Sequence, residues 1–438
     1  MRTYQRWGKA GSGVWTLAVW CASGWHLRHA GPMHLRSRSS LSHLACARCG
    51  QVVSPNQLHG ACVCGGPLLC HYDINALRKN LSRGSLIGRP ATLWRYAELL
   101  PVQDAANCVS LGEGFTPLLP LHWGEQHGLP NLWLKDEGQN PTGTFKARGA
   151  AVSVTRLREL GVRDVVVSSS GNAGDAWAVY CRRAGIRATI ILPDDVPEAT
   201  RVETALTGQR LHTFGGHNGR GGRLARAYAD SHQSFWANTF QEPYRVEGKK
   251  TMGLELAEQL GWRMPDVVVY PIGGGVGLLG IWKAFMELKA LGWIEGKLPR
   301  FVVAQYEGCA PFVEAFHADR ESCEPWGDIS TLPGGLRAPK SPADFLILKI
   351  LRETNGTAIA VSSDDALRAV RAVMETDGVF LCPEAGTTIV ALRRLLAEGQ
   401  VRDDETVAII NTGSGLKYTS LFPAPLNRIA DEDEMLPS

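Results

Sequence analysis

The sequence lacks an apolar run close to the roughly 20 residues that a membrane-spanning helix needs, which excludes an integral membrane protein. It also lacks a basic stripe. Residues 1–40 hold six of the 46 Lys and Arg residues and none of the 43 Asp and Glu residues, so residues 41–438 carry three more acidic than basic side chains. That balance argues against nucleic-acid binding. The eleven cysteines are odd in number and scattered, so they indicate no disulfide framework and favour a cytoplasmic protein.

What is present is an ordinary globular composition, with 44% hydrophobic and 20% charged residues in a chain of 438. That length suggests two or three domains. Residues 1–40 stand apart, because four of the 13 tryptophans lie there among Gly and Ser without a helical or strand period. We interpret residues 1–40 as a disordered or mis-assigned extension, with Met33 as a second start, and expect residues 1–32 to be dispensable.

Two cysteine pairs follow this extension. Cys46 and Cys49 form the first pair, Cys62 and Cys64 the second, and a glycine follows each. Zinc ribbons present four thiolates to the metal in this way. The second pair has one residue between its cysteines instead of two, so a structural zinc and a knuckle without metal both remain open. Either would be structural, because four thiolates leave no open position for catalysis.

From about residue 110, short β-branched runs alternate with amphipathic stretches. The pattern predicts strands over residues 165–169, 188–192, 267–270, 301–305 and 406–410, and helices over residues 175–184 and 278–291. Continuous apolar strands that alternate with helices predict an α/β fold of parallel sheets, with helices covering both faces. Ligands of such sheets bind at the loops that leave the carboxyl ends of the strands.

Four loops carry chemistry. Residues 135–150 contain an Asn-Pro-Thr-Gly turn, after which Lys146 enters a helix; taken alone, it would be a surface lysine. Residues 168–174 and 273–277 join strands to helices with small residues, so their backbone N–H groups are accessible to a carboxylate or a phosphate. Residues 411–417 form a last polar loop after the final strand. Each loop by itself is also compatible with a plain turn.

Taken together and in this order, the loops resemble the fold-type-II enzymes that use pyridoxal 5′-phosphate, and within them the threonine synthase family. Residues 112–118, residues 243–251 and the cysteine pairs belong to the same resemblance, which runs from about Cys46 to Lys417. It implies a two-domain α/β enzyme preceded by a small zinc-ribbon-like knuckle. The implied division is residues 41–74 for the knuckle, 75–147 with 249–438 for the large cofactor-binding domain, and 148–248 for the small domain.

The resemblance also implies roles for single residues. Lys146 is similar to the lysine that joins the cofactor through an imine and then moves protons on the substrate. Asn172 would hydrogen-bond the 3′-oxygen of the cofactor. Thr412 would meet the pyridine nitrogen, where a neutral hydroxyl leaves the ring a weaker electron sink, suited to elimination. Ser169 and Ser170 would help hold the substrate carboxylate. The cradle for the cofactor phosphate would be Gly273, Gly274, Gly275, Val276 and Gly277.

Arg245 is expected to bind a phosphate of the substrate itself. It precedes a helix that we expect from about residue 248, and a guanidinium beside helix N-terminal amides suits a phosphate. The alternative is that Arg245 pairs at the surface with a neighbouring glutamate, Glu242 or Glu247.

The resemblance thus implies a cytoplasmic lyase, expected as a homodimer, with pyridoxal 5′-phosphate and, where the knuckle binds metal, one structural zinc. It would convert O-phospho-L-homoserine and water to L-threonine and phosphate, without nucleic-acid or membrane partners. Rivals on the same scaffold are a threonine or serine dehydratase and a β-replacement enzyme similar to cysteate synthase, because the glycine loop also resembles that of the dehydratases. A rival of another class is a cofactor- or zinc-binding protein without turnover.

Overall fold

The computed structural model describes residues 39–215 and 218–423, so the expectation for residues 1–38 lies outside the described residues. The first sheet of the described chain is a small antiparallel one of order β2-β1-β3. Its strands are β1 (Leu41–Cys46), β2 (Val52–Val53) and β3 (Leu68–Tyr72). Cys46 is the last residue of β1, and the other three cysteines of the two pairs lie in the loops between the strands of this sheet.

The larger of the two remaining sheets has six strands in the order β12-β11-β10-β13-β5-β4. All neighbours are parallel except β4 and β5. The strands are β4 (Leu118–Pro120), β5 (Leu132–Asp136), β10 (Val267–Pro271), β11 (Arg300–Tyr306), β12 (Thr357–Val361) and β13 (Val407–Asn411). Valine, isoleucine and leucine fill the central strands, and a strand that is apolar on both faces must be covered on both.

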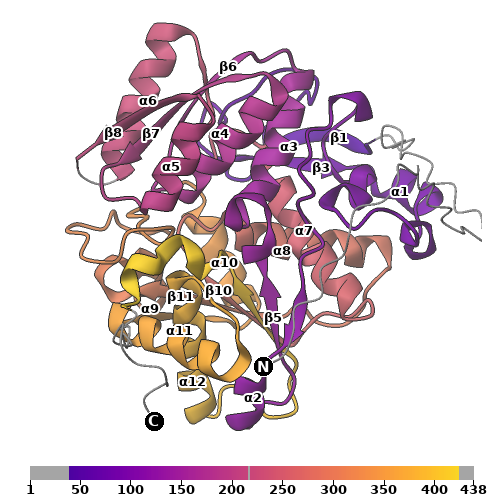
Figure 1. Ribbon diagram of the computed structural model, residues 1–438. Helices are drawn as coiled ribbons and strands as arrows, with labels where there is room; N and C mark the ends of the chain where they lie inside the picture. The colour runs from indigo at the N-terminus through magenta and orange to yellow at the C-terminus, as the bar shows by residue number, and fades with distance from the viewer. Residues whose placement is uncertain (1–38, 216–217, 424–438) are drawn as a thin grey trace, which may run out of the picture. The chain divides into compact units, whose positions relative to one another are not determined.

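The smaller parallel sheet has the order β8-β7-β6-β9. Its strands are β6 (Asp164–Ser168), β7 (Arg187–Pro193), β8 (Arg210–Phe214) and β9 (Phe235–Trp236), connected by α4 (Asn172–Ala184), α5 (Glu198–Leu206) and α6 (Asn218–His232). The connections from β6 to β7 and from β7 to β8 run in one direction across the sheet, and the connection from β8 to β9 runs in the opposite direction. Because such crossovers are right-handed, α4 and α5 cover one face and α6 the other, as Figure 1 shows.

Further helices surround the large sheet, and α12 (Pro383–Ala397) packs along β10, β11 and β13. The other α-helices are α1 (Ile74–Asn80), α2 (His122–Gln126), α3 (Lys146–Glu159), α7 (Tyr244–Gln259), α8 (Val276–Leu291), α9 (Pro311–His317), α10 (Asp344–Glu353) and α11 (Ser363–Asp377). Short 3₁₀ turns include η4 (Glu137–Gln139), η5 (Pro141–Gly143) and η7 (Gly415–Leu421). None of the helices in the described residues is long and apolar enough to cross a membrane.

The predicted α/β class with parallel sheets is confirmed, and the five strands and two helices whose bounds were predicted are present within a few residues of those bounds. One expectation is wrong: the helix expected from about residue 248 begins at Tyr244. The side chain of Glu242 accepts hydrogen bonds from the backbone N–H groups of Tyr244 (2.8 Å) and Arg245 (3.1 Å), so it caps an earlier first turn. The domain boundaries proposed at residues 147 and 248 stay a prediction.

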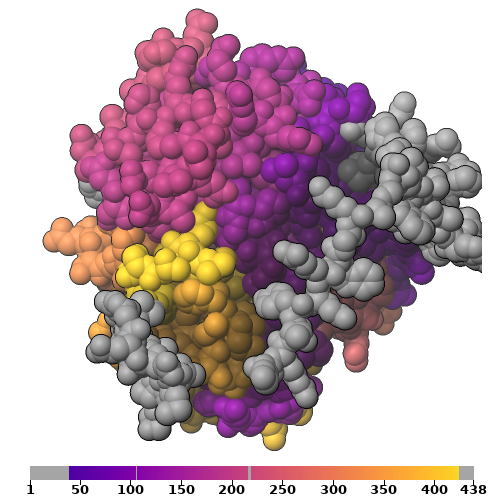
Figure 2. Space-filling view, viewed as in Figure 1, coloured from indigo at the N-terminus to yellow at the C-terminus, as the bar shows by residue number. Residues whose placement is uncertain are grey.

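Figure 2 shows the yellow surface of the last described residues between the magenta surface of the small-sheet region and the orange surface of the large-sheet region. There η7 contacts α5. The Nζ atom of Lys417 in η7 lies 2.5 Å from a carboxylate oxygen of Asp175 and 3.1 Å from one of Glu203. The segment after β13 therefore ties the two parallel sheets together beside the cavity described next.

Candidate active site

The order of the large sheet brings three of the predicted loops together. Strands β10, β13 and β5 are neighbours and run parallel, so their carboxyl ends lie at one edge of the sheet. The loop after β10 holds residues 273–277, the loop after β13 holds Thr412, and the chain after β5 leads to Lys146. Strand β6 of the small sheet adds residues 168–170, and the loops enclose a cavity of about 280 Å³.

Every residue that the sequence singled out for cofactor or substrate lines this cavity. They are Lys146, Ser169, Ser170, Asn172, Arg245, Gly273, Gly274, Gly275, Val276, Gly277 and Thr412. The four cysteines of the knuckle are not among the residues that line it. The structure thus brings the residues together, and their individual roles stay predictions.

Lys146 is the first residue of α3 and follows the tight turn η5, in which Thr142 has a φ of 62°. The loop is fixed to β13, because the N–H group of Phe145 donates to the carbonyl oxygen of Thr412 at 3.1 Å. Burial, and then the positive charge of Arg245, lower the pKa of the Lys146 amine to about 8. A larger fraction of this amine is therefore neutral, and so nucleophilic, than of an exposed lysine.

The glycine loop is built so that its backbone lines the cavity. Gly275 has a φ of 84° and directly precedes α8, whose first-turn N–H groups have no acceptor within the helix. A Cβ atom at Gly273 would lie 2.1 Å from the carbonyl oxygen of Gly335, and one at Gly277 would lie 1.9 Å from the Tyr270 hydroxyl. Side chains are excluded at these positions, and the loop suits a phosphate at a helix N-terminus.

Asn172 belongs to a hydrogen-bonded chain that ends on a buried carboxylate. Its side-chain amide donates to the hydroxyl of Tyr418 at 2.8 Å, and that hydroxyl donates to Oε1 of Glu384 at 2.8 Å. The N–H group of Gly335 donates to the same oxygen at 2.8 Å. The other oxygen, Oε2, is buried without a hydrogen-bond partner among the described residues, although Glu384 lines the cavity.

Thr412 is buried at the end of β13, and its hydroxyl lies 3.5 Å from the sulfur of Cys382. On the small-sheet side of the cavity, the N–H group of Gly171 donates a hydrogen bond to the hydroxyl of Ser169 at 3.1 Å. Gly171 has a φ of 137° and precedes α4, so the free N–H groups of that helix start beside the serines. This arrangement can hold a carboxylate.

Arg245 lies in the first turn of α7, where it is buried and forms an ion pair with Glu242. Its guanidinium also donates to the Thr239 hydroxyl at 3.1 Å and to the carbonyl oxygen of Ala237. Glu242 is one of the two partners considered from the sequence, but the pair is in the interior and not at the surface. The reason is the early start of α7, which turns Arg245 toward the cavity.

Sequence reasoning missed three charged residues that line the cavity, Lys249, Lys340 and Glu384. None of them directly follows a strand, which is where loops with chemistry were sought. Lys249 lies four residues after Arg245 on α7, so the helical period alone places both on one face. Glu384 begins α12 after Cys382-Pro383 and carries no recognisable sequence signal.

These side chains fit pyridoxal 5′-phosphate. The Lys146 amine, with its lowered pKa, matches the aldehyde of the cofactor, and the glycine loop, which is closed to side chains, matches its phosphate. The amide of Asn172 matches the 3′-oxygen, and the hydroxyl of Thr412 matches the ring nitrogen. When bound, the cofactor supplies an electron-withdrawing ring that stabilises negative charge on carbons of an amino-acid substrate.

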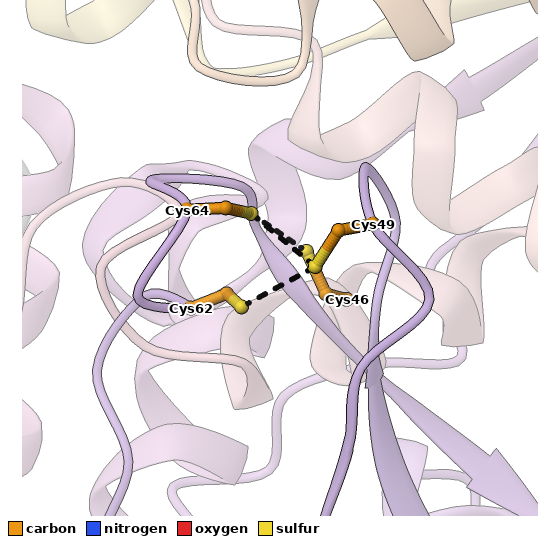
Figure 3. A group of neighbouring side chains, drawn as sticks. All are labelled: Cys46, Cys49, Cys62 and Cys64. Carbon is orange, nitrogen blue, oxygen red and sulfur yellow. Dashed lines mark hydrogen bonds between the residues drawn. The ribbon is translucent and has the colours of Figure 1, made fainter.

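The cysteine pairs form a second, separate site (Figure 3). The sulfur atoms of Cys46, Cys49, Cys62 and Cys64 all lie within 4.8 Å of one another, with the closest contact, between Cys49 and Cys64, at 3.4 Å. Ligands of a tetrahedral zinc lie about 3.8 Å apart, from a Zn–S distance of about 2.3 Å. A Cβ atom at Gly66 would lie 2.7 Å from the Cys46 sulfur, so this close approach requires glycine. The set fits zinc.

The sheet of the knuckle is attached to the helices behind the cavity. Tyr72 on β3 donates its hydroxyl to Glu247 of α7 at 2.8 Å, and the guanidinium of Arg48 lies 4.6 Å from the ring centre of Phe345. The side chain of Arg156 on α3 donates to the carbonyl oxygen of Pro55 at 2.7 Å. The knuckle therefore supports α3 and α7.

Comparison with known proteins agrees with this geometry. A family model described as pyridoxal-phosphate dependent enzyme matches residues 109–413. Threonine synthase of Methanocaldococcus jannaschii is 33% identical over 374 residues, 85% of this chain and 92% of that protein. Threonine synthase of Methanosarcina acetivorans is 33% identical over 378 residues, 86% of this chain and 92% of that protein.

Solved structures show the same fold at lower identity. Maize serine racemase is 21% identical with a TM-score of 0.58, covering 70% of this chain and 91% of its own. The processed form of threonine deaminase isoform 2 from Solanum lycopersicum is 17% identical with a TM-score of 0.60, covering 76% of this chain and 95% of its own.

Proposed function

The chain belongs to the pyridoxal-phosphate-dependent enzymes and, within them, to the threonine synthases; from that premise we propose that it converts O-phospho-L-homoserine and water to L-threonine and inorganic phosphate. The cavity contains the observation that carries this proposal. It has a glycine loop suited to one phosphate and, on another element, a buried guanidinium at Arg245 suited to a second. A phosphorylated substrate beside a phosphorylated cofactor accounts for both.

In this proposal, different residues of the chain act on different parts of the substrate. Ser169, Ser170 and the start of α4 bind the substrate carboxylate and so fix its α-carbon near Lys146. The Lys146 amine, with a pKa near 8, can accept and return protons at substrate carbons at neutral to mildly alkaline pH. Arg245 holds the phosphate that leaves and stabilises its negative charge.

Two finer statements belong to the same proposal. The cysteine cluster holds one structural zinc, which is supported by its sulfur geometry and by the fact that none of its four cysteines lines the cavity. The enzyme acts as a homodimer in the cytoplasm, which the resemblance of the sequence implies.

The test is substrate choice. Purified protein loaded with pyridoxal phosphate is mixed separately with O-phospho-L-homoserine, O-phospho-L-serine, L-threonine and L-serine, and phosphate, threonine and oxoacid are measured. We expect equal amounts of phosphate and threonine from phosphohomoserine and little oxoacid. Oxoacid from threonine without phosphate from phosphohomoserine would assign the protein to the dehydratases, and phosphate from phosphoserine alone to the β-replacement enzymes.

A further inference from the structure

Helix α7 is unusual because it carries many charges and is buried along almost its whole length. Its first glutamate, Glu247, is within ion-pair distance of Lys250, and its second, Glu255, pairs with Arg148 and Lys135. Arg245 pairs with Glu242 just ahead of the helix. Burying a charge is unfavourable unless an opposite charge accompanies it, so each of these partners is needed.

Lys249 is the exception on this helix. It is 3% exposed, and its Nζ atom has no acidic partner within 4 Å among the described residues. The ammonium donates instead to two backbone carbonyl oxygens, those of Phe145 at 2.7 Å and Lys146 at 3.1 Å. An ammonium has three N–H groups, so one remains for another acceptor.

The position of that group is defined by its neighbours. A Cβ atom at Gly149 would lie 2.7 Å from Nζ of Lys249, so glycine is required for the lysine to extend there. Nζ lies 4.7 Å from the ring centre of Phe145, and Nζ of Lys146 lies 4.3 Å from the same centre. Gly149, Lys249 and Arg245 all line the cavity beside Lys146.

The electrostatics of this region favour an incoming anion. Burial, and then the charges of Lys146 and Arg245, lower the pKa of Lys249 well below its ordinary value. The ion pair with Glu242 partly offsets the charge of Arg245, so the guanidinium offers mainly directed hydrogen bonds. A phosphate dianion bound by the two side chains would favour the protonated form of Lys249, and that ammonium would balance one of its two negative charges.

We propose that Lys249 is a specificity-determining residue that, together with Arg245, binds the phosphate of the substrate and supplies the positive charge of that site. The inference rests on the proposed function and deepens it, because it selects a doubly charged phosphate ester over substrates with a neutral side chain. The glycine loop, in this assignment, serves the phosphate of the cofactor alone.

The experiment compares the cofactor-loaded wild type with Lys249→Met, Lys249→Gln and Lys249→Arg, and with Lys297→Met at an exposed lysine as the matched control. Binding of inorganic phosphate is measured by calorimetry, cofactor affinity by absorbance titration, and kcat and KM with phosphohomoserine. Thermal melts report whether each variant folds.

We expect Lys249→Met and Lys249→Gln to weaken phosphate binding about ten- to a hundredfold, as for loss of a hydrogen bond to a charged group, and to raise KM similarly. Lys249→Arg should keep most of the affinity, because it keeps the charge. Lys297→Met should match the wild type, and cofactor affinity should change less than about threefold in all variants.

Unchanged phosphate affinity in a folded Lys249→Gln protein would overturn the inference. A loss of cofactor affinity with phosphate binding intact would overturn it as well, because Lys249 would then bind the phosphate of the cofactor. If Lys249→Met does not fold, the comparison of Lys249→Gln with Lys249→Arg decides the question. Failure of the proposed function looks different: the wild type would then release no phosphate from phosphohomoserine.

Discussion

The reactivity of Lys146 depends on opposing effects on the pKa of its amine. Burial and then the charge of Arg245 lower this pKa, Glu384 and Asp175 raise it, and together they hold it at about 8. Only the neutral amine attacks the aldehyde of the cofactor. We therefore expect cofactor-free protein to take up pyridoxal phosphate faster as the pH rises, with a midpoint near pH 8. Visible absorption measures this rate.

Two variants test the sign of each contribution. Arg245→Met removes a cation, so the protonated amine becomes less unfavourable and the midpoint should move to higher pH. Glu384→Gln removes a negative charge and keeps the size of the side chain, so the midpoint should move to lower pH. Shifts in the same direction, or a wild-type midpoint near the ordinary lysine value of about 10.4, would contradict this description of the site.

Replacement of Lys146 itself should separate chemistry from folding. Lys146→Ala removes the amine and its proton transfers, so we expect no visible band from bound cofactor and a fall in kcat/KM of at least about a thousandfold. Circular dichroism and the melting temperature should stay near those of the wild type, because Lys146 forms none of the ion pairs of the interior. A band that survives in the variant would show that another lysine binds the cofactor.

The packing of α3 against α7 depends on a buried group of charges. Arg148 on α3 donates to Glu137 and Glu255, and Lys135 on β5 lies 2.8 Å from Glu255. Arg148→Met leaves Glu137 without its cationic partner in the interior and Glu255 with Lys135 alone, which should cost about 3–5 kcal/mol of unfolding free energy in urea. Arg187→Met, which removes an exposed pair with Asp164, should cost less than about 1 kcal/mol.

The same charges predict an acid limit. Burial opposes ionisation of Glu255, but Arg148 and Lys135 outweigh it and hold its pKa at about 2, below the ordinary 4.5. A carboxyl group with a lower pKa in the folded state stabilises above its unfolded pKa. We expect this stabilisation to be complete above about pH 4.5 and to disappear as the pH falls toward 2, measured by urea unfolding across that range.

The knuckle is an element whose loss should affect stability before chemistry. Its cysteine cluster shares no residue with the cavity lining, but Tyr72 donates a hydrogen bond to Glu247 of α7. Metal analysis should find one zinc per chain. Chelation, or Cys46→Ser, should lower the melting temperature by several degrees, while protein that remains folded keeps kcat within about twofold. Cys108→Ser outside the knuckle is the control. Rapid loss of activity without loss of structure would contradict a purely structural zinc.

At the scale of the whole chain, the sequence predicted five of the strands, which are β6, β7, β10, β11 and β13, and the chemistry-bearing loops with their cavity residues. Strand order in a parallel sheet gathers carboxyl ends, and so these loops, at one edge. It did not predict Lys249 or Glu384, which reach the cavity from helices. Their inward orientation depends on how α7 and α12 pack, and nearest-neighbour patterns contain no information on that packing. The partner of Arg245 depended likewise on where α7 begins.

The extension at residues 1–32 is the remaining prediction at this scale. The resemblance begins near Cys46, and the family model begins at residue 109. Protein that starts at Met33 should therefore match the full chain in yield, melting temperature and kcat/KM. A clear drop in yield or rate on deletion would show that the segment has a role in the enzyme.

The order β10-β13-β5 also has a consequence for synthesis of the chain on the ribosome. The strand that separates the glycine loop from the Lys146 turn is β13, which begins at Val407, more than 250 residues after β5 ends at Asp136. Until that strand has left the ribosome, the middle of the sheet is an open slot with two unpaired edges. We therefore expect cofactor capture to wait for the synthesis of β13, and the nascent chain to need protection from aggregation until that strand has paired.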